Sequence, residues 1–163
     1  MNISARPSES TRPANRREWL AILARTPHAC MKEAMDAALG ANSPPAFDWL
    51  RAPDVGLAMV RGRVGGTGDA FNLGEVTITR ATLRVRSDDG RATVGMAVHM
   101  GRDKERATLA ALADALLQMP AFETRMQQHV IAPLAARIAE ARRQKQARAA
   151  ATKVEFFTMV RGD

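Results

Sequence analysis

The hydrophobic positions of the chain change their period twice, from helical to alternating and back to helical. Apolar residues recur at helical spacing within residues 15–26 and again within residues 27–40, which is typical of amphipathic helices. Asn15 can cap the start of the first helix and Gly40 the end of the second. We therefore expect two N-terminal helices, preceded by a disordered segment over residues 1–14, where large apolar side chains are scarce.

Strands are expected after the second helix. Residues 55–64 are apolar, and residues 74–86 are rich in β-branched side chains, a composition that favours strands. The glycine-rich loop "GGTGDAFNLG" lies between them. The preceding stretch, "ANSPPAFDWLRAPD", is expected to be a proline-rich connection whose aromatic residues Phe47 and Trp49 pack against the core.

The second expected strand contains a conflict of register. Val76 and Ile78 share one face of a regular strand, whereas Leu83 and Val85 occupy the other face. Because a flat strand cannot bury both pairs on the same side, we expect a β-bulge near residues 80–82.

A third strand is expected after a tight turn. The sequence "SDDGR" contains Asp89 and Gly90, which readily adopt the positive φ angles of a hairpin turn. Residues 93–100 then alternate strictly, with Val94, Met96, Val98 and Met100 on one face and Thr93, Gly95, Ala97 and His99 on the other. We expect a three-stranded antiparallel meander that is covered on one face.

The last third of the chain returns to helical spacing. Residues 103–119 carry a broad stripe of leucine and alanine that starts at a possible Asp103 N-cap and closes at Pro120. A shorter helix is expected over residues 121–131. Pro133 then suits the first turn of a long final helix.

The final helix changes character along its length. Leu134, Ile138 and Ala141 form a stripe that is expected to be buried, and beyond it only alanine remains apolar. The patterns together predict the α+β class, with a small antiparallel three-stranded sheet packed with N-terminal helices and a long C-terminal helix. Residues 15–153 are expected to form this single domain, and residues 154–163 an apolar docking tail.

The composition limits the class of partner and the cellular compartment that we expect for this protein. The chain has 163 residues and a formal charge of +7, so an anionic partner is expected: nucleic acid, a phosphorylated ligand or an acidic protein face. Cys30 is the only cysteine, which excludes an intramolecular disulfide and favours a reducing compartment. Neither a secretory signal nor a membrane-spanning apolar run is recognisable in the sequence. We expect a cytoplasmic protein with no membrane partner.

The glycine-rich loop is one candidate anion site. Consecutive backbone amides in such loops can bind anions, and arginine suits phosphate. Neither the P-loop nor the dinucleotide-binding spacing is present, and a plain hairpin connection is the competing interpretation. Glu75 could act as a general acid or base, or could be a solvated strand-end charge. The residues expected near an anion or substrate are Arg61, Arg63, Gly65, Gly66, Thr67, Gly68 and Glu75.

The basic final helix and the tail form a second candidate site. From Arg137 to Lys153 cations greatly outnumber the single acidic residue, Glu140, which suits either a solvated face or a binding face. Nucleic acid is disfavoured because no aromatic residue is interleaved with these cations. Docking on a partner is expected through Lys153, Val154, Phe156, Phe157, Met159, Val160 and Arg161.

No residue pattern of catalysis or metal binding is recognisable. His28, His99 and His129 are dispersed, without the ligand spacing of a zinc site. Cys30 lies in an apolar helical segment, where a structural thiol is the ordinary case. We therefore expect neither catalytic residues nor a metal or cofactor bound by this chain itself.

Several segments resemble one known family. "MVRGRVGGTGDAFNLGEVTITRATLRV" and the terminal "ATKVEFFTMVRGD" are similar to the G subunit of the phosphonate carbon-phosphorus lyase system. "REWLAILAR", "HMGRDKERATLAALADALLQ" and "IAPLAARIAEARR" also match its pattern. The resemblance covers residues 16–163.

The resemblance implies a role inside a larger assembly. It implies a core complex with the H, I and J subunits, joined by the L subunit for the synthase step, in which ATP and a phosphonate give ribose 1-phosphonate 5-triphosphate. The I subunit is implied to carry that chemistry, and the G subunit to be accessory and non-catalytic. The alternative is a stand-alone basic protein that binds nucleic acid or a phosphate ligand.

Overall fold

The computed structural model describes residues 15–40, 44–87 and 90–152. The expectations for residues 1–14 and for the tail from Lys153 onward lie outside this part of the chain. The elements in chain order are α1 (Arg16–Leu23), α2 (His28–Leu39), β1 (Phe47–Arg63), η2 (Val64–Gly66), β2 (Ala70–Arg86), β3 (Ala92–Met100), α3 (Lys104–Leu117), α4 (Pro120–Met126), η3 (Gln127–Ile131) and α5 (Ala132–Ala151).

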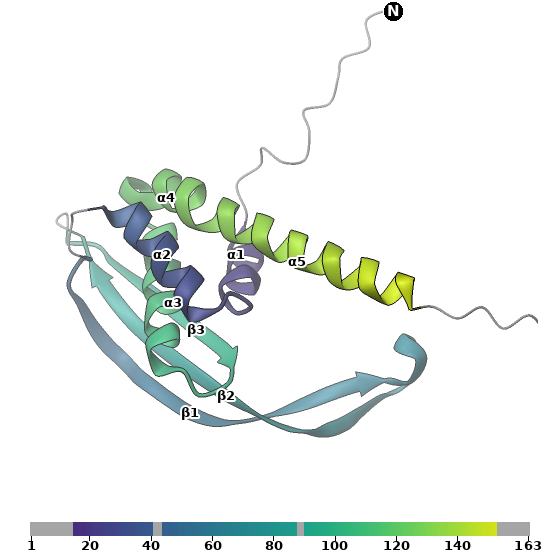
Figure 1. Cartoon of the computed structure of the whole chain (residues 1–163). Coiled ribbons are helices and arrows are strands. Elements are labelled where there is room, and N and C mark those ends of the chain that lie inside the picture. The colour runs from purple at the N-terminus through teal and green to yellow at the C-terminus, as the bar shows by residue number, and fades with distance from the viewer. Residues whose placement is uncertain (1–14, 41–43, 88–89, 153–163) are drawn as a thin grey trace, which may run out of the picture.

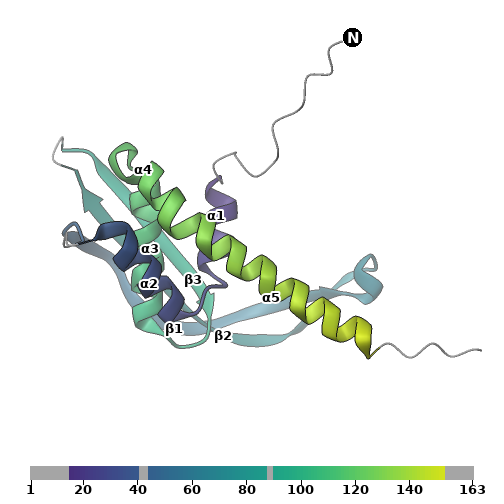
Figure 2. The same cartoon turned by 45° about the horizontal axis from the view of Figure 1, so that its top comes forward.

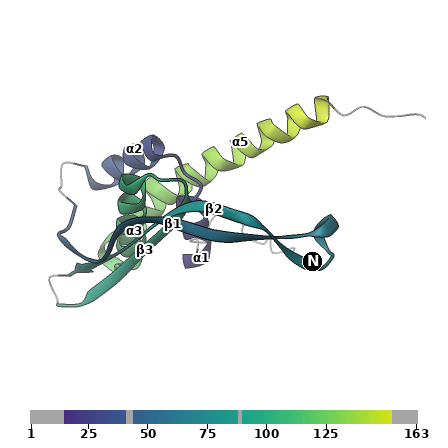
Figure 3. The same cartoon turned by 90° about the horizontal axis from the view of Figure 1, so that it is seen from below.

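The protein has a sheet layer covered by helices on one face. The three strands are antiparallel in the order β1-β2-β3, and Figure 1 and Figure 3 show all the helices on the same side of the sheet. The core lies between these layers, where α3 contributes the largest share of buried side chains. The predicted α+β class, meander, N-terminal helices and long C-terminal helix are confirmed.

The helix ends follow the local sequence. The Asn15 side chain accepts a hydrogen bond from the backbone N–H of Glu18, and the Glu18 carboxylate accepts one from the backbone N–H of Asn15. This capping box satisfies otherwise unpaired donors. Asp103 caps α3 through the N–H of Arg106, and Gly40 ends α2 with a φ of 62°. The three predicted caps are confirmed.

Strand β3 presents its small residues, rather than its large ones, to the helices. The predicted alternation is confirmed, but Gly95, Ala97 and His99 are buried while Val94, Met96, Val98 and Met100 are exposed. A Cβ on Gly95 would lie 2.0 Å from the carbonyl oxygen of Ala111. Glycine therefore permits α3 to approach the sheet closely, and the apolar row of β3 faces away from the core.

The first hairpin is longer than predicted. β1 begins at Phe47 rather than at residue 55, and β2 begins at Ala70 rather than at residue 74. The stretch predicted to be a connection is thus a strand, and Pro53 is tolerated within it because β1 is an edge strand with irregular pairing there. Phe47 packs on the core, but Trp49 stays exposed, so the expectation for Trp49 was wrong.

The predicted bulge in β2 was also wrong. β2 pairs with β3 without interruption from Ile78 to Arg86, and the extra residues lie in β1, between Trp49 and Asp54. Val76 and Ile78 are only half-buried, on the face opposite Leu83 and Val85. The expected conflict of register does not arise, because the helices cover only the face that carries Leu83 and Val85. The irregular pairing lies in β1 instead of β2.

The last two predicted helices are continuous. α4 passes through the π-helical turn η3 directly into α5. Pro133 has no N–H and its ring would clash with a carbonyl in a regular helix interior, so a wider turn just before it relieves both problems. Of the predicted stripe on α5, Leu134 is buried and Ile138 half-buried, but Ala141 is exposed because the helix has already left the body.

Candidate partner-binding surface

Two elements project from the body in the same direction. β3 pairs with β2 only from Ile78 onward, so residues 57–77 form a two-stranded ribbon, called here the hairpin arm. Figures 1, 2 and 3 show the hairpin arm and the second half of α5 leaving the same side of the body. Both elements are therefore available to a molecule that approaches from that side.

The tip of the hairpin arm is a compact turn. Gly65 and Gly66 have φ angles of 58° and 82°, values that favour glycine. The Gly68 N–H donates to the Val64 carbonyl oxygen at 2.9 Å, and Arg63 Nη1 donates to the Gly68 carbonyl oxygen at 3.0 Å. The glycines thus close a hairpin, as the competing interpretation holds, and Arg63 helps to hold it closed.

The structure brings most of the predicted anion-site residues together. Arg61, Arg63 and the loop through Gly68 share the tip, all exposed except the half-buried Gly68. Glu75 lies apart from this turn, paired across the strands with Met59, and makes no ion pair with Arg61 or Arg63 in the described part of the chain. The role of the tip as an anion-binding site stays a prediction.

The hairpin arm also carries large apolar side chains, which the sequence analysis did not identify. Leu57 is 62% exposed and Met59 is 50% exposed. Val64, Phe71 and Leu73 are exposed as well. The apolar composition of residues 55–64 could have indicated this patch. These side chains stay uncovered because their strand extends beyond the core.

The second half of α5 is exposed and basic. Every residue from Glu140 to Ala151 is exposed. Arg143 pairs with Glu140, and farther back Arg137 reaches Glu33 on α2 at 3.1 Å. The remaining cations of this helix within the described residues, Arg142, Lys145 and Arg148, have no acidic partner.

The uncovered face of the sheet combines apolar and charged residues. The exposed β3 row lies next to Arg80 and Arg84 of β2, which form ion pairs with Asp54 and Asp48 of β1 at 3.2 Å and 3.0 Å. The hydrogen bond from Arg84, together with the charge of Arg86, holds the pKa of Asp48 below its ordinary value. These pairs stabilise the carboxylate form without burying it.

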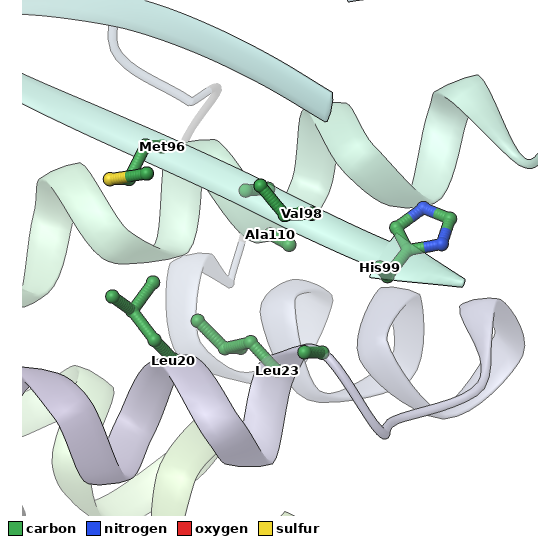
Figure 4. A pocket seen from close by; sticks show the side chains of 8 residues that line it. Leu20, Leu23, Met96, Val98, His99 and Ala110 are labelled. Atoms are coloured by element: carbon green, nitrogen blue, oxygen red, sulfur yellow. The ribbon is translucent and has the colours of Figure 1, made fainter. Parts of the chain in front are cut away.

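A small pocket lies between α1 and β3 (Figure 4). Its volume is about 110 Å³, and its apolar walls include Leu20, Leu23, Met96 and Val98. His99 is its one titratable group, and its ring nitrogens lie 2.9 Å from the Met100 carbonyl oxygen and 3.0 Å from that of Asp103. Both imidazole nitrogens thus lie within hydrogen-bonding distance of carbonyl oxygens in the segment that links β3 to α3.

A wider cavity lies at the other end of the sheet, between the β2–β3 turn and α4. Its volume is about 630 Å³, and it is lined by Arg86, Arg91, Gln118 and Phe122 among others. Arg86 is engaged with Asp48 at 3.2 Å. None of the predicted anion-site residues borders this cavity.

The described surface is distinguished by exposed apolar side chains. In the described part of the chain no group of three or more His, Cys, Asp or Glu side chains is arranged to hold a metal ion, and no described helix has the length and apolarity needed to cross a membrane. Exposed apolar side chains instead gather on the hairpin arm and on the uncovered sheet face. Exposed apolar patches of this kind mark interaction surfaces.

Comparison with known proteins identifies the family of this chain. A family model described as "Phosphonate metabolism protein PhnG" matches residues 14–162. A relative from Rhizobium meliloti (strain 1021), named alpha-D-ribose 1-methylphosphonate 5-triphosphate synthase subunit PhnG, is 41% identical over 163 residues, which is 100% of this chain and 99% of the relative. The chain therefore belongs to the PhnG family of phosphonate metabolism proteins.

Proposed function

We propose that this chain is a non-catalytic subunit of an alpha-D-ribose 1-methylphosphonate 5-triphosphate synthase, acting in phosphonate catabolism in the cytoplasm. The observation that carries the proposal is the full-length, 41% identical relative that bears this subunit name. The exposed apolar residues of the hairpin arm and sheet support it, because they suit contact with neighbouring subunits.

In this proposal the other carbon-phosphorus lyase subunits are the partners. The H, I and J subunits form the core with this chain, and the L subunit joins for the synthase step. ATP and the phosphonate are substrates of the assembled complex, and this chain binds no cofactor of its own. Its charge of +7 suits an acidic face on a neighbouring subunit.

Co-expression tests the proposal directly. The full-length chain is expressed with the H, I and J subunits, and the size of the purified complex is measured by light scattering. We expect this chain to co-elute with the others in one species. Elution of this chain alone, while the remaining subunits assemble without it, would contradict the proposal.

The tail is proposed to anchor this chain on the I subunit, with Phe156 and Phe157 as the buried side chains. Truncation after Lys153 removes the anchors and leaves the helical body intact. We expect co-purification with the I subunit to be lost. Unchanged co-purification would remove the tail from the interface.

The tip of the hairpin arm is proposed to border the phosphate or triphosphate site of the assembly. The variant Arg61→Ala/Arg63→Ala should assemble normally and lose turnover. Because Arg63 also closes the tip through Gly68, the single variant Arg61→Ala separates an electrostatic role from a structural one. Full turnover in an assembled complex that contains the double variant would exclude the tip.

A further inference from the structure

The packed face of α5 becomes a cationic face beyond the body. Leu134 is buried and Ile138 half-buried, and the same side of the helix continues through Ala141 to Lys145 and Arg148 at the helical period. Within the body α5 contacts α1 and α2, and beyond the body α5 and the hairpin arm leave the same side (Figure 1). Lys145 and Arg148 therefore lie on the side of α5 that continues its packed face, next to the space between the two projections.

Neither charge is neutralised by the described part of the chain. The carboxylates near α5 are already engaged, Glu140 with Arg143 and Glu33 with Arg137. Lys145 and Arg148 make no ion pair there, and both are exposed. A ligand in this space thus meets positive charge on the helix side.

The hairpin arm contributes an apolar surface to the same space. Leu57 and Met59 pair with Thr77 and Glu75 in the register that places Thr79 on the helix-covered face of the sheet. They therefore continue that covered face beyond the point where the helices end, and they are exposed for this reason. A ligand that fits both sides carries acidic groups toward α5 and aliphatic groups toward the arm.

We infer that the space between α5 and the hairpin arm receives an amphipathic acidic segment of a neighbouring subunit. A second copy of this chain is a poor fit because it carries the same charge of +7. Nucleic acid is a poor fit because Leu57 and Met59 offer no stacking surface. The inference rests on the proposed function, since it requires a neighbouring subunit, but it concerns a surface separate from the tail.

A charge-reversal variant tests the cationic side. Lys145→Glu/Arg148→Glu is co-expressed with the other subunits, and the amount of each subunit that co-purifies is measured. We expect at least about a tenfold loss of one subunit at physiological salt, because two like charges would then face the acidic segment. The matched control is Arg125→Glu/Arg143→Glu, which makes the same charge change on exposed side chains of α4 and of the opposite face of α5; it should retain that subunit.

Carbodiimide coupling tests whether Lys145 faces a carboxylate. The reagent takes up one water molecule as its urea while the Lys145 amine and a contacting carboxyl group form an amide. Mass spectrometry of the coupled wild-type complex should place Lys145 on an Asp or Glu of a neighbouring subunit. Lys145→Arg keeps the charge and lacks the amine, so it should abolish the coupled peptide and leave co-purification unchanged.

A matched pair of leucines tests the apolar side. Leu57→Ser should lower co-purification of the same subunit, whereas Leu50→Ser should not, although Leu50 is a comparably exposed β1 residue at 51%. Leu50 lies away from the arm, next to the irregular pairing of β1. Equal losses in the two variants would overturn the assignment to the arm.

The outcomes separate this inference from the proposed function. If the wild-type chain joins no complex, the proposed function fails. If the wild type assembles and the charge-reversed variant assembles equally well, only this inference fails. Coupling of Lys145 solely to another copy of this chain, or loss of the partner on nuclease treatment of the wild type, would also overturn it.

Discussion

The carboxylate of Asp114 joins three elements at one point inside the protein. It is fully buried in α3 and accepts hydrogen bonds from Trp19 Nε1 of α1 at 2.8 Å, from Arg16 Nη2 at 2.8 Å and from the backbone N–H of Met96 at 2.9 Å. A buried carboxylate is tolerated only when such partners replace its lost hydration. Asp114 thus fixes α1 and the free edge of β3 onto α3.

Replacement of Asp114 by alanine should weaken the whole fold. The substitution leaves the indole N–H and the Met96 N–H without acceptors in the interior, and each unsatisfied buried donor is costly. We expect the free energy of unfolding to fall by about 3 kcal/mol, measured by urea denaturation of the isolated chain. Asp36→Ala, which breaks the exposed pair with Lys32, is the control and should change it by less than about 1 kcal/mol. Equal stability of the two variants would contradict the role given to Asp114.

At the scale of elements, β1 and β2 are tied together on the open face by ion pairs. Asp48 of β1 meets both Arg84 and Arg86 of β2, at 3.0 Å and 3.2 Å. All three side chains contact solvent, so the pairs contribute little to stability. They do set the ionisation of Asp48, whose pKa is lowered chiefly by the hydrogen bond from Arg84.

The pH dependence of Asp48 follows from the sign of this shift. Because the folded pKa lies below the unfolded one, the stabilisation is present above the unfolded pKa and is lost as the pH falls through the folded pKa. Arg84→Ala should raise the pKa of Asp48 toward its ordinary value, as measured by carbon-detected NMR titration of the carboxyl group. Lys32→Ala, on α2, should leave it unchanged. An unaltered Asp48 titration in Arg84→Ala would show that this hydrogen bond does not form in solution.

Local sequence determined the helices better than the strands. Asn15, Gly40 and Asp103 act through hydrogen bonds and φ angles that span a few neighbouring residues, so their effect is visible in the sequence. The length of β1 is not local, because Pro53 and its neighbours become a strand only by pairing with β2. The π-helical turn before Pro133 likewise depends on a helix that continues on both sides.

For the whole molecule, the hairpin arm is separate from the core. The buried apolar cluster contains no residue of the arm. Replacing residues 60–74 by Asn-Gly, which suits a two-residue hairpin turn, should therefore leave the isolated chain folded. We expect the free energy of unfolding to change by less than about 1 kcal/mol, since the arm adds little buried apolar surface, as measured by urea denaturation followed by circular dichroism. Cooperative unfolding at a much lower urea concentration would show that the arm supports the body.

The candidate site was only partly visible in the sequence. The glycines, Arg61 and Arg63 were identified, and they do share one turn at the tip of the arm. Leu57 and Met59 were missed as site residues because an apolar strand is expected to face a core, and only the tertiary structure leaves theirs uncovered. The row of Val94 to Met100 has the same explanation, since alternation defines two faces but not which one the helices cover.

The sequence by itself determined the α+β class, the helix caps, the meander and the family, because these depend on periodicity, on neighbouring residues and on the order of residues along the chain. The tertiary structure decided which face of the sheet is buried and where the body ends. Gly95 lets α3 pack against the small-residue face of β3. The second half of α5 and the hairpin arm extend beyond the body, where no other described element covers them. Both properties depend on contacts between residues that are distant in sequence, so a local sequence pattern does not predict them.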